Sequence, residues 1–392
     1  MIQRRFGRTG LRMPVFSAGF MRSMQSWQDV AEGEISASSQ ENLAAVVSRA
    51  LELGITHLET ARGYGSSERQ LGLVLSGLRR QDVILQTKVG PEDDPERFAA
   101  NVLDSLARLR VDHVDLLAIH GINDYRSLWQ VCRPDGCLAA ARRLQRQGRV
   151  GWVGFSGHGS TEVILKALDH RQEDGFDYVN LHWYAIFQCH TVVLEKARSR
   201  DMGVFIISPT DKGGMLQNPP HRLRRLSSPL SPMQFNDLFC LLRPEIHTIS
   251  IGAAQPADFD EHVAALAFLD RPELVREIYG RWQRAMAEAT GRPDPDHPWS
   301  RLPSWERTPG YINLPMILWL DNLARGWDLL AYARQRYAKL GRDMPWVPGN
   351  NGADAGRYDL SAIADAAGME AEELVRRLQG AHRLLAGQED CA

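Results

Sequence analysis

The stretch HLETARGYGSSERQLG, residues 57–72, passes from a strand-like segment through a Gly-Tyr-Gly loop into the start of a helix. The run THLET (56–60) follows Ile55 and has the length of a buried strand. The Ser-Ser-Glu segment that follows (66–68) supplies the hydroxyl and carboxylate groups that favour a helix N-terminus. A tyrosine between two glycines does not serve mainly to pack a core. We therefore expect Tyr64 to be a reactive residue on a loop at the end of a strand.

The rest of the chain alternates between strand-like and helix-like segments. Seven further apolar runs have the length of strands: 15–20, 83–88, 113–120, 151–156, 177–182, 203–208 and 247–252. Amphipathic segments with a helical period lie between them, for example at 42–53, 98–109 and 137–148. This order predicts an α/β protein with a (β/α)8 TIM barrel. The turn at residues 7–10 predicts an N-terminal β-hairpin.

A doubly wound open sheet is the alternative fold. It should carry a Gly-x-Gly-x-x-Gly motif after its first strand in order to bind a dinucleotide. The segment MRSMQSW (21–27), which follows the first predicted strand, has no such motif. The barrel is therefore the predicted fold.

The composition restricts the class of protein. The chain has 392 residues, a net charge of −2 and 44% hydrophobic residues, which argues against a general affinity for nucleic acid or acidic lipid. Its five cysteines are scattered, as expected for free thiols in a reducing compartment. The N-terminus lacks the apolar core of a signal peptide, and no apolar run is long enough for a membrane span. We predict a cytoplasmic protein that has no membrane segment.

Side chains suited to acid–base chemistry follow the predicted strands: Glu59, Tyr64, Lys88 and His120. The carboxyl ends of barrel strands share one face, so these side chains should meet. A cation beside a phenol lowers its pKa, and a buried carboxylate can orient the lysine. The set suits protonation of a carbonyl oxygen that His120 orients, while hydride reaches the carbon. Taken singly, Lys88 could be a surface residue, His120 a core histidine and Glu59 a loop cap.

These residues resemble the signature of the aldo-keto reductase family, which reads Asp-Thr-Ala-x-x-Tyr-Gly-x-Ser-Glu. Here the stretch 59–68 reads Glu-Thr-Ala-Arg-Gly-Tyr-Gly-Ser-Ser-Glu. The resemblance covers nearly residues 1–270 and includes the RRFGRTGL hairpin. It implies that Tyr64 is the general acid, with Lys88 and His120 in supporting roles. Glu59 departs from the family's aspartate by one methylene, so either Lys88 or the backbone must adjust.

The resemblance also implies a nicotinamide dinucleotide held by strand ends and late loops. NADP(H) is the family's usual cofactor. Ala254 stands where an arginine is expected to pair with the 2′-phosphate, so NAD(H) is also possible. Asn180 stands where a glutamine is usual. The expected cofactor-binding residues are Gly19, Phe20, Met21, Ser156, Asn180, Ser208, Pro209, Thr210, Lys212, Gly213, Gly252, Ala254, Asp258 and His262.

The last hundred residues differ in character. A Pro-rich segment (291–303) follows the predicted barrel domain, so we place the boundary between residues 1–288 and 289–392. One helix should begin after Asn313, with an apolar stripe that reaches Ala331, and another should begin near Met369. This region is similar to the C-terminal ferredoxin-like domain of a subgroup of the family. Those relatives carry cluster cysteines that are missing here, so the expected domain is helical, with no iron–sulfur cluster and no other metal.

The predicted function is NAD(P)H-dependent reduction of an aldehyde or ketone, or the reverse oxidation of an alcohol. The alternative is a weakly active or inactive barrel that binds a ligand or a partner, which the departures from the family pattern favour. Aromatic residues after two strands are expected to line the substrate pocket: Tyr125, Trp129, Trp183 and Tyr184. The sequence favours no particular sugar, quinone-like ring or small aldehyde as the substrate.

Overall fold

The computed structural model describes residues 1–296, 302–342, 344 and 347–387. Its contacts divide the chain into two compact units. The first unit comprises Met1–Trp183, His190–Thr210 and Asp237–Asp270. The second comprises Tyr184–Cys189, Asp211–Asn236 and Arg271–Ala392.

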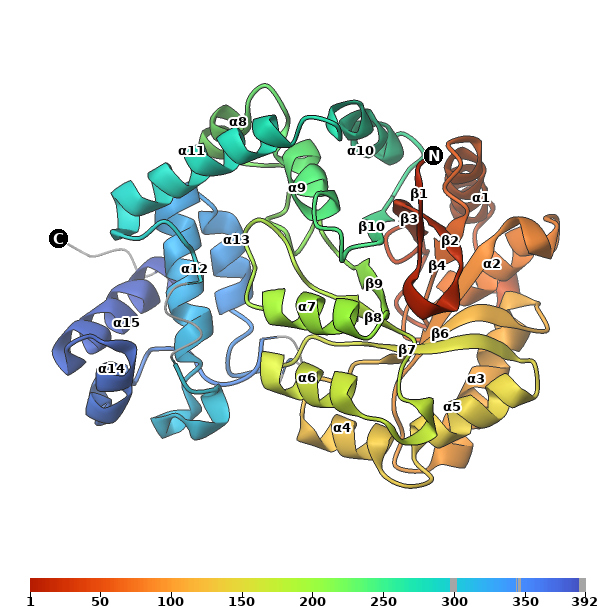
Figure 1. The fold of residues 1–392 in the computed structure, drawn as a ribbon, viewed down its shortest axis with the longest axis horizontal. Coiled ribbons are helices and arrows are strands. Elements are labelled where there is room, and N and C mark those ends of the chain that lie inside the picture. Colours follow the sequence, from red (N-terminus) through yellow and green to blue (C-terminus); the bar gives the residue numbers. More distant parts are fainter. Residues whose placement is uncertain (297–301, 343, 345–346, 388–392) are drawn as a thin grey trace. The chain divides into compact units, whose positions relative to one another are not determined.

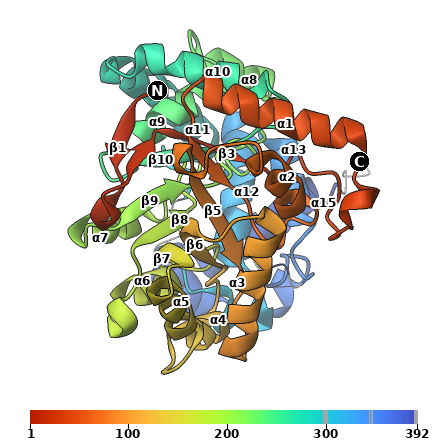
Figure 2. The same cartoon turned by 90° about the vertical axis from the view of Figure 1, so that its right-hand side faces the viewer.

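A closed barrel of parallel strands forms the first unit, which confirms the predicted fold (Figures 1 and 2). The strands follow one another around the barrel in chain order, and β10 closes it by pairing with β3. All eight lie within the segments predicted from their apolar runs or within one residue of them: β3 (Phe16–Gly19), β4 (His57–Glu59), β5 (Ile84–Val89), β6 (Val114–His120), β7 (Val150–Ser156), β8 (Tyr178–Leu181), β9 (Gly203–Ile206) and β10 (Thr248–Gly252).

Helices follow the strands and surround them (Figure 2). Most of them turn an apolar stripe inward; in α3, for example, Phe98, Val102 and Leu109 are fully buried. The first unit holds α1 (Ala37–Glu52), α2 (Ser67–Leu75), α3 (Pro95–Leu109), α4 (Tyr125–Cys132), α5 (Cys137–Arg146), α6 (Thr161–Asp169), α7 (Thr191–Ser199) and α10 (Asp258–Ala265).

The predicted hairpin is present as β1 (Gln3–Arg5) and β2 (Arg12–Pro14), which pair antiparallel. Its turn places Phe6 in the core, where the ring lies 5.6 Å from that of Tyr178, the first residue of β8. Gly7 approaches the first residue of β9, Gly203, so closely that a Cβ on Gly7 would lie 2.4 Å from the Gly203 nitrogen. The hairpin therefore packs at the amino-terminal ends of the strands and leaves their carboxyl ends to the site.

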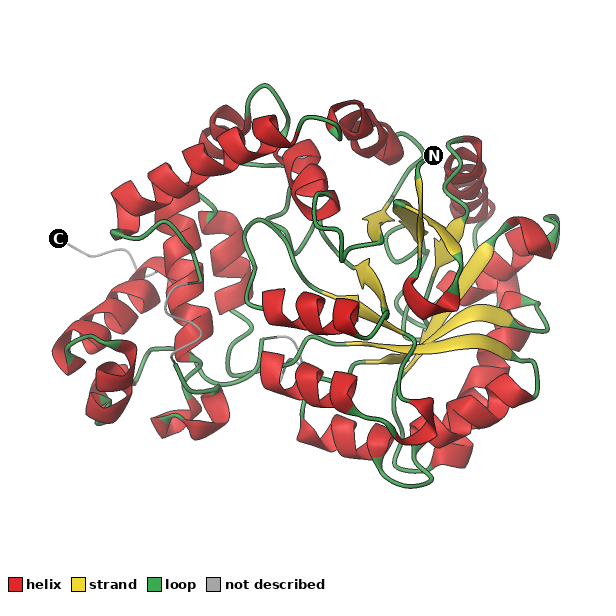
Figure 3. Cartoon of the chain, viewed as in Figure 1, coloured by secondary structure: helices red, strands yellow, loops and turns green. Residues whose placement is uncertain are grey.

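The second unit consists of helices and loops in the part of the chain that the structure describes (Figure 3). Trp282 and Trp327 are both fully buried in it, with ring centroids 4.9 Å apart. Its helices are α8 (His221–Ser227), α11 (Pro272–Thr290), α12 (Leu314–Trp327), α13 (Leu330–Tyr337), α14 (Ser361–Ala367) and α15 (Ala371–Ala386), and α9 (Pro232–Leu241) is divided between the units. The predicted boundary after residue 288 falls within α11 and stays a prediction.

The two predicted C-terminal helices begin where the sequence indicates. The side chain of Asn313 accepts a hydrogen bond from the main-chain N–H of Met316 and caps α12. The apolar stripe predicted to continue to Ala331 is interrupted, because Asp328 adopts a left-handed conformation with a φ of 61°. A separate helix, α13, begins two residues later.

Candidate active site

The register of the barrel sets strand ends side by side. Gly19 is paired with Glu59 between β3 and β4. On the other side of the barrel, His120 of β6, Ser156 of β7 and Asn180 of β8 form one row across three strands. These residues therefore lie at the carboxyl ends of their strands, as expected for a barrel site.

Glu59 and Lys88 form an ion pair in the interior of the barrel, where their side chains are 6% and 1% exposed. The Lys88 ammonium also donates a hydrogen bond of 3.0 Å to the carbonyl oxygen of Thr60. Burial alone would lower the pKa of Lys88, but the charges of Glu59 and Tyr64 outweigh it and raise that pKa. The raised pKa favours the charged form of Lys88, and Glu59 is the largest cause of the increase.

The extra methylene of Glu59 is accommodated by β3, which pairs with β4 in the barrel, and by β10, which pairs with β3. A Cβ on Gly19 would lie only 2.6 Å from Oε1 of Glu59. This oxygen therefore has space because Gly19 has no side chain. Ser250 of β10 donates a hydrogen bond of 3.0 Å to the same oxygen. The longer acid thus reaches Lys88 without displacing it from the barrel interior.

Tyr64 lies next to both Lys88 and His120. The Lys88 ammonium is 4.9 Å from the centre of the phenol ring, and the His120 ring meets it edge-on at 5.8 Å. Burial raises the pKa of the Tyr64 phenol and outweighs Lys88, which lowers it. Lys88 acts in the direction expected of a cation beside a phenol, but desolvation is the larger effect. Tyr64 carries its proton at neutral pH.

The second glycine of the Gly-Tyr-Gly loop is required by a close contact between two loops, which the sequence did not reveal. Gly65 has a φ of +50°, and a Cβ there would lie 2.0 Å from the carbonyl oxygen of Ser26. The close approach brings Trp27 edge-on to Tyr64, with ring centroids 6.4 Å apart. Trp27 is 65% exposed, so it is an additional candidate for substrate contact. The tryptophan in MRSMQSW was the available signal, but nothing local linked it to Tyr64.

Two histidines beyond the strand ends form a further contact between side chains, which the sequence did not predict. The ring nitrogens of His158 and His182 are hydrogen bonded, and the rings stack with centroids 4.4 Å apart. His182 follows the end of β8 directly, and its side chain is buried. The two residues are 24 positions apart, so only the pairing of β7 with β8 brings them together.

The side-chain amide of Asn180 is a candidate to bind a ligand. It is fully buried, and neither its amide nitrogen nor its amide oxygen has a hydrogen-bond partner within the described protein. Its neighbour in the register, Ser156, is also fully buried, and the Ser156 hydroxyl accepts a hydrogen bond of 3.1 Å from the N–H of Gly121. The donor and the acceptor of this buried amide are both unused by the protein. They are complementary to a carboxamide, which has a donor and an acceptor of its own.

The residues expected at the adenosine end surround Asp258. This carboxylate accepts a 2.8 Å hydrogen bond from the N–H of Ala254 and lies 3.8 Å from the guanidinium of Arg22. Arg22 also donates a bond of 2.9 Å to the carbonyl oxygen of Gly252. A cation therefore lies in this region although Ala254 replaces the expected arginine. His262 is 3% exposed and is bonded to the buried Asp237 at 2.6 Å.

The remaining expected cofactor residues lie in different surroundings. Phe20 is fully buried, and its N–H donates to the carbonyl oxygen of Glu59, whereas Met21 is half-buried. Ser208 has a left-handed φ of 54° and begins the segment that continues with Pro209 and Thr210 in the first unit. Lys212 and Gly213 belong to the second unit. The roles of all these residues stay predictions.

The four aromatic residues expected to line the pocket differ in exposure. Tyr125 and Trp129 on α4 are 51% and 57% exposed. Trp183 is buried and stacks on Phe239, with ring centroids 5.0 Å apart. Tyr184 is also buried, and it belongs to the second unit. Their part in substrate binding stays a prediction.

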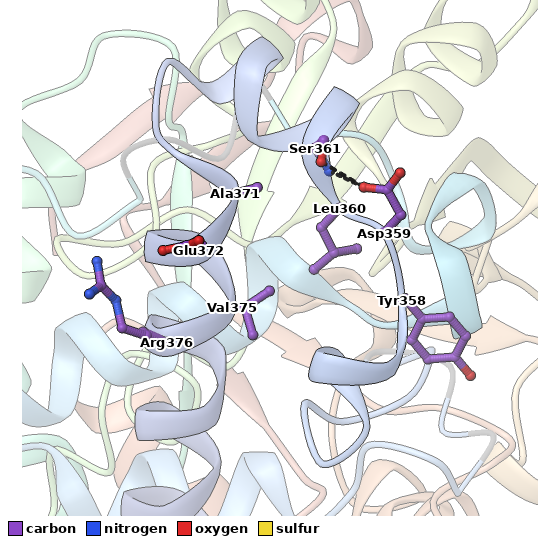
Figure 4. Close-up of a pocket in the computed structure, with 8 residues that line it drawn as sticks. All are labelled: Tyr358, Asp359, Leu360, Ser361, Ala371, Glu372, Val375 and Arg376. Carbon is purple, nitrogen blue, oxygen red and sulfur yellow. Dashed lines mark hydrogen bonds between the residues drawn. The ribbon is translucent and has the colours of Figure 1, made fainter.

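A pocket on the C-terminal helices lies within the second unit (Figure 4). Its lining includes none of the predicted catalytic or cofactor residues and consists of Tyr358, Asp359, Leu360, Ser361, Ala371, Glu372, Val375 and Arg376. Across the described residues, no group of three or more His, Cys, Asp or Glu side chains is placed to hold a metal ion. Cys391 lies outside the described residues, and the expected absence of a cluster stays a prediction.

None of the helices that the structure describes has both the length and the apolar character that a membrane span requires. Cys132 and Cys137, which are close in sequence, are free thiols.

The barrel brings a tyrosine, a buried lysine, a histidine and a carboxylate together near the ends of its strands. The sequence model of the Aldo/keto reductase family matches residues 18–289, and the chain belongs to this family. It is an enzyme of the aldo/keto reductase type. The predicted family membership is thereby confirmed.

Two characterised relatives illustrate the similarity. The chain is 25% identical to L-galactose dehydrogenase of Arabidopsis thaliana over 301 residues, which cover 70% of this chain and 91% of that protein. It is 27% identical to methylglyoxal reductase YeaE of Escherichia coli K12 over 198 residues, which cover 46% of this chain and 62% of that protein.

Solved structures show the same fold. The holo form of the aldo-keto reductase AKR11C1 from Bacillus halodurans superposes with a TM-score of 0.58 at 21% identity, covering 71% of this chain and 96% of that one. The thermostable aldo-keto reductase Tm1743 gives a TM-score of 0.61 at 20% identity, covering 72% of this chain and all of that one.

Proposed function

We propose that the protein is an NAD(P)H-dependent oxidoreductase that reduces an aldehyde or ketone to an alcohol, or catalyses the reverse reaction, with Tyr64 as the general acid. The observation that carries the proposal is the contact of Tyr64 with both Lys88 and His120, with Lys88 paired to Glu59. Of the two relatives named above, one is an L-galactose dehydrogenase and the other is a methylglyoxal reductase. Their names support a small carbonyl or sugar compound as the class of substrate.

The side chains divide the chemistry between them. Tyr64 keeps its proton at neutral pH because burial raises the pKa of its phenol, and it can give that proton to a carbonyl oxygen. Lys88, which stays charged, stabilises the phenolate that remains. His120 lies at the edge of the phenol ring, where it can hydrogen bond the same oxygen and orient the substrate. In the reverse direction the phenolate accepts the alcohol proton.

The residues present fit a nicotinamide dinucleotide. The unpartnered amide of Asn180 complements a carboxamide, and Ser156 lies beside it in the register. When bound, the dinucleotide supplies the hydride, and the chain's own residues supply and remove the proton. We propose that Asn180 and Ser156 hold the carboxamide.

The preference for NADP(H) over NAD(H) should be weak. Ala254 has no charge to pair with a 2′-phosphate, and Asp258 presents a carboxylate nearby. Arg22 is the cation of this region, and its contact with Asp258 at 3.8 Å partly neutralises both charges. We infer that both nucleotides bind, with Arg22 providing most of what remains of the preference for NADP(H).

The test is a fluorescence titration of the pure protein with NADPH and with NADH, followed by an assay of NAD(P)H consumption with an aromatic aldehyde. We expect saturable binding of at least one nucleotide, and turnover that falls by about 10²- to 10⁴-fold in the Tyr64→Phe variant. An unchanged fluorescence signal with both nucleotides would overturn the proposal and favour a barrel that binds another ligand.

A further inference from the structure

Polar side chains lie inside the barrel next to the Glu59–Lys88 pair. Side chains two positions apart on a strand point to the same side of the sheet, so His57 shares the inward face of β4 with Glu59. For the same reason Gln86 shares the inward face of β5 with Lys88, and the register pairs Gln86 with Glu59. Both polar side chains therefore line the interior beside the ion pair.

The imidazole of His57 is hydrogen bonded through one of its two nitrogens. Its Nδ1 is bonded to the Ser17 hydroxyl at 2.6 Å, and that hydroxyl is bonded to the Thr248 hydroxyl at 2.7 Å. Burial, followed by the charge of Lys88, lowers the pKa of His57 to about 3, so the ring is neutral at pH 7. A neutral ring has one donor and one acceptor nitrogen. Nε2 is buried and has no hydrogen-bond partner among the described residues, so one of these two capacities is unused.

Gln86 and Tyr178 contribute further polar atoms of the same kind. Both residues are fully buried, and within the described part of the chain no hydrogen bond reaches the Gln86 amide or the Tyr178 hydroxyl. Gln86 opposes the lowering of the His57 pKa, so its amide lies near the ring, although no direct hydrogen bond joins them. Burial, Asp177 and then Glu59 raise the pKa of Tyr178, so its phenol interacts with the Glu59 carboxylate. Strands β4, β5 and β8 thus form an interior polar cluster of His57, Gln86 and Tyr178.

Apolar contacts hold the two rings of this cluster in place. The His57 ring meets the Phe205 ring edge-on, with centroids 5.2 Å apart, and Tyr178 belongs to the buried core cluster that contains Phe205. A Cβ on Gly154 of β7 would lie 2.6 Å from the Tyr178 ring, so the phenol packs directly on that strand. In a core of native packing density, neither ring can turn its polar atom toward another protein group without displacing its neighbours.

Water is the ligand that this set of groups fits. A buried polar atom without a hydrogen-bond partner is costly, and a buried water satisfies such atoms by making about three hydrogen bonds. The cluster contains both donors and acceptors, because the Gln86 amide has one of each kind and the Tyr178 hydroxyl can act as either. Lys88 would repel a bound cation and Glu59 a bound anion, so a neutral molecule is favoured.

We propose that the interior polar cluster binds water molecules that bridge its three side chains, and that this hydration keeps the Glu59–Lys88 pair ionised. Dipoles that can orient toward buried charges reduce the cost of removing those charges from bulk water. Without them, transfer of the Lys88 proton to Glu59 becomes easier, and a neutral Lys88 no longer favours phenolate at Tyr64. Gln86 and Tyr178 are thus positioning residues that act through the ion pair. This role rests on the proposed function, whereas the water site does not.

The first test measures stability and needs no activity. Wild type, Tyr178→Phe, Gln86→Met and the double variant are compared by their free energies of unfolding in urea. Removing a buried hydroxyl that has no partner relieves a desolvation cost, whereas removing one that is bonded to water lowers stability. We expect both single variants to be less stable and the double variant to lose less than the sum, because both changes act on the same waters. A more stable Tyr178→Phe, or additive losses, would overturn the site.

Ser105→Ala is the matched control, because it removes a fully buried hydroxyl on α3, outside the barrel interior. Its effect should add to that of Tyr178→Phe. A high-resolution crystal structure of the wild-type protein decides the site if a core variant does not fold. We expect water within hydrogen-bond distance of His57 Nε2 and the Gln86 amide. A direct bond between these two groups, with no water beside them, would contradict the proposal.

The pH dependence of alcohol oxidation tests the role of the waters. Tyr178→Phe should shift the profile to more alkaline pH by about half a pH unit, the effect of one neutral hydrogen bond, whereas Ser105→Ala should leave it at the wild-type position. An unshifted profile in Tyr178→Phe would refute the role even where the waters are present. A protein that oxidises no alcohol with either nucleotide would refute the proposed function and this role together, while the urea and crystal data still decide the water site.

Discussion

The carboxylate of Glu59 pairs with the ammonium of Lys88 inside the barrel, with both side chains almost completely buried. The pair is supported from two neighbouring strands, because Ser250 donates to the other carboxylate oxygen and Gly19 leaves room for it. Burial favours the neutral form of a lysine, so the charge on Lys88 depends on this partner. The state of the Tyr64 phenol depends in turn on that charge.

Removing the charge of Glu59 should move the pH profile of alcohol oxidation. In Glu59→Gln, burial should lower the pKa of Lys88, and a neutral Lys88 no longer favours phenolate at Tyr64. Oxidation needs phenolate, so its profile should shift to more alkaline pH, whereas Glu59→Asp should stay near wild type. The measurement is the rate of oxidation against pH for the three proteins. A shift of the Gln variant to more acidic pH would show that Lys88 stays charged without Glu59.

The space beside Gly19 should be specific for the longer acid. A Cβ at this position would lie 2.6 Å from Oε1 of Glu59 and 2.8 Å from Oγ of Ser250. Gly19→Ala should therefore lower the melting temperature and the rate of reduction, and a second change, Glu59→Asp, should restore part of both by withdrawing the carboxylate. Additive losses in the double variant would contradict this account.

Tyr64→Phe tests the general acid directly. The variant keeps the ring that contacts Lys88 and His120 but has no proton to give, so reduction should fall by about 10²- to 10⁴-fold. The affinity for NADPH should change by less than about twofold, because the phenol proton is not needed for cofactor binding. Turnover and nucleotide affinity are measured on the same preparations. Wild-type turnover in this variant would exclude Tyr64 as the acid.

Introducing the family's arginine should change the choice of nucleotide. Ala254→Arg places a guanidinium close to Asp258 and Arg22, and it should increase the preference for NADPH over NADH by about tenfold, as expected for a charged hydrogen bond. Ala254→Gln, which adds length without charge, is the control and should leave the ratio unchanged. Dissociation constants for both nucleotides give the answer. An equal change in both variants would mean that side-chain size, and not charge, determines the preference.

A buried histidine should make the fold sensitive to acid. His57 is fully buried in the barrel, its Nδ1 bonded to the hydroxyl of Ser17 at 2.6 Å, and burial lowers its pKa to about 3. Since the folded protein resists protonation that the unfolded chain accepts below about pH 6.5, stability falls as the pH decreases from there toward 3. This histidine alone should lower the free energy of unfolding by about 3 kcal/mol between pH 7 and pH 4.

His57→Gln should lose less of its free energy of unfolding over that pH range than wild type does, whatever its stability at pH 7. The free energy is obtained from urea denaturation at several pH values. His113→Gln, which removes an exposed histidine, should lose as much as wild type. The same acid loss in all three proteins would show that other groups, such as the buried His190, determine the acid sensitivity.

The sequence by itself determined the parts of this protein that depend on local patterns. Apolar runs and helical periods predicted the eight barrel strands, the hairpin and the helix after Asn313, because burial on one face imposes these periods on neighbouring residues. The residues that follow the predicted strands supplied the catalytic candidates, and the pattern around Tyr64 indicated the family. Each of these patterns lies within a short stretch of the chain.

The tertiary structure alone decided which distant groups meet and how they influence one another. Ser250 reaches Glu59 across 191 positions of sequence because β10 closes the barrel against β3, and Trp27 reaches Tyr64 because Gly65 allows the two loops to touch. The direction of the pKa shift of Tyr64 depends on how deeply the phenol is buried, which no short stretch of sequence specifies. Contacts and desolvation are properties of the closed barrel, since they arise only when strands far apart in the chain have come together.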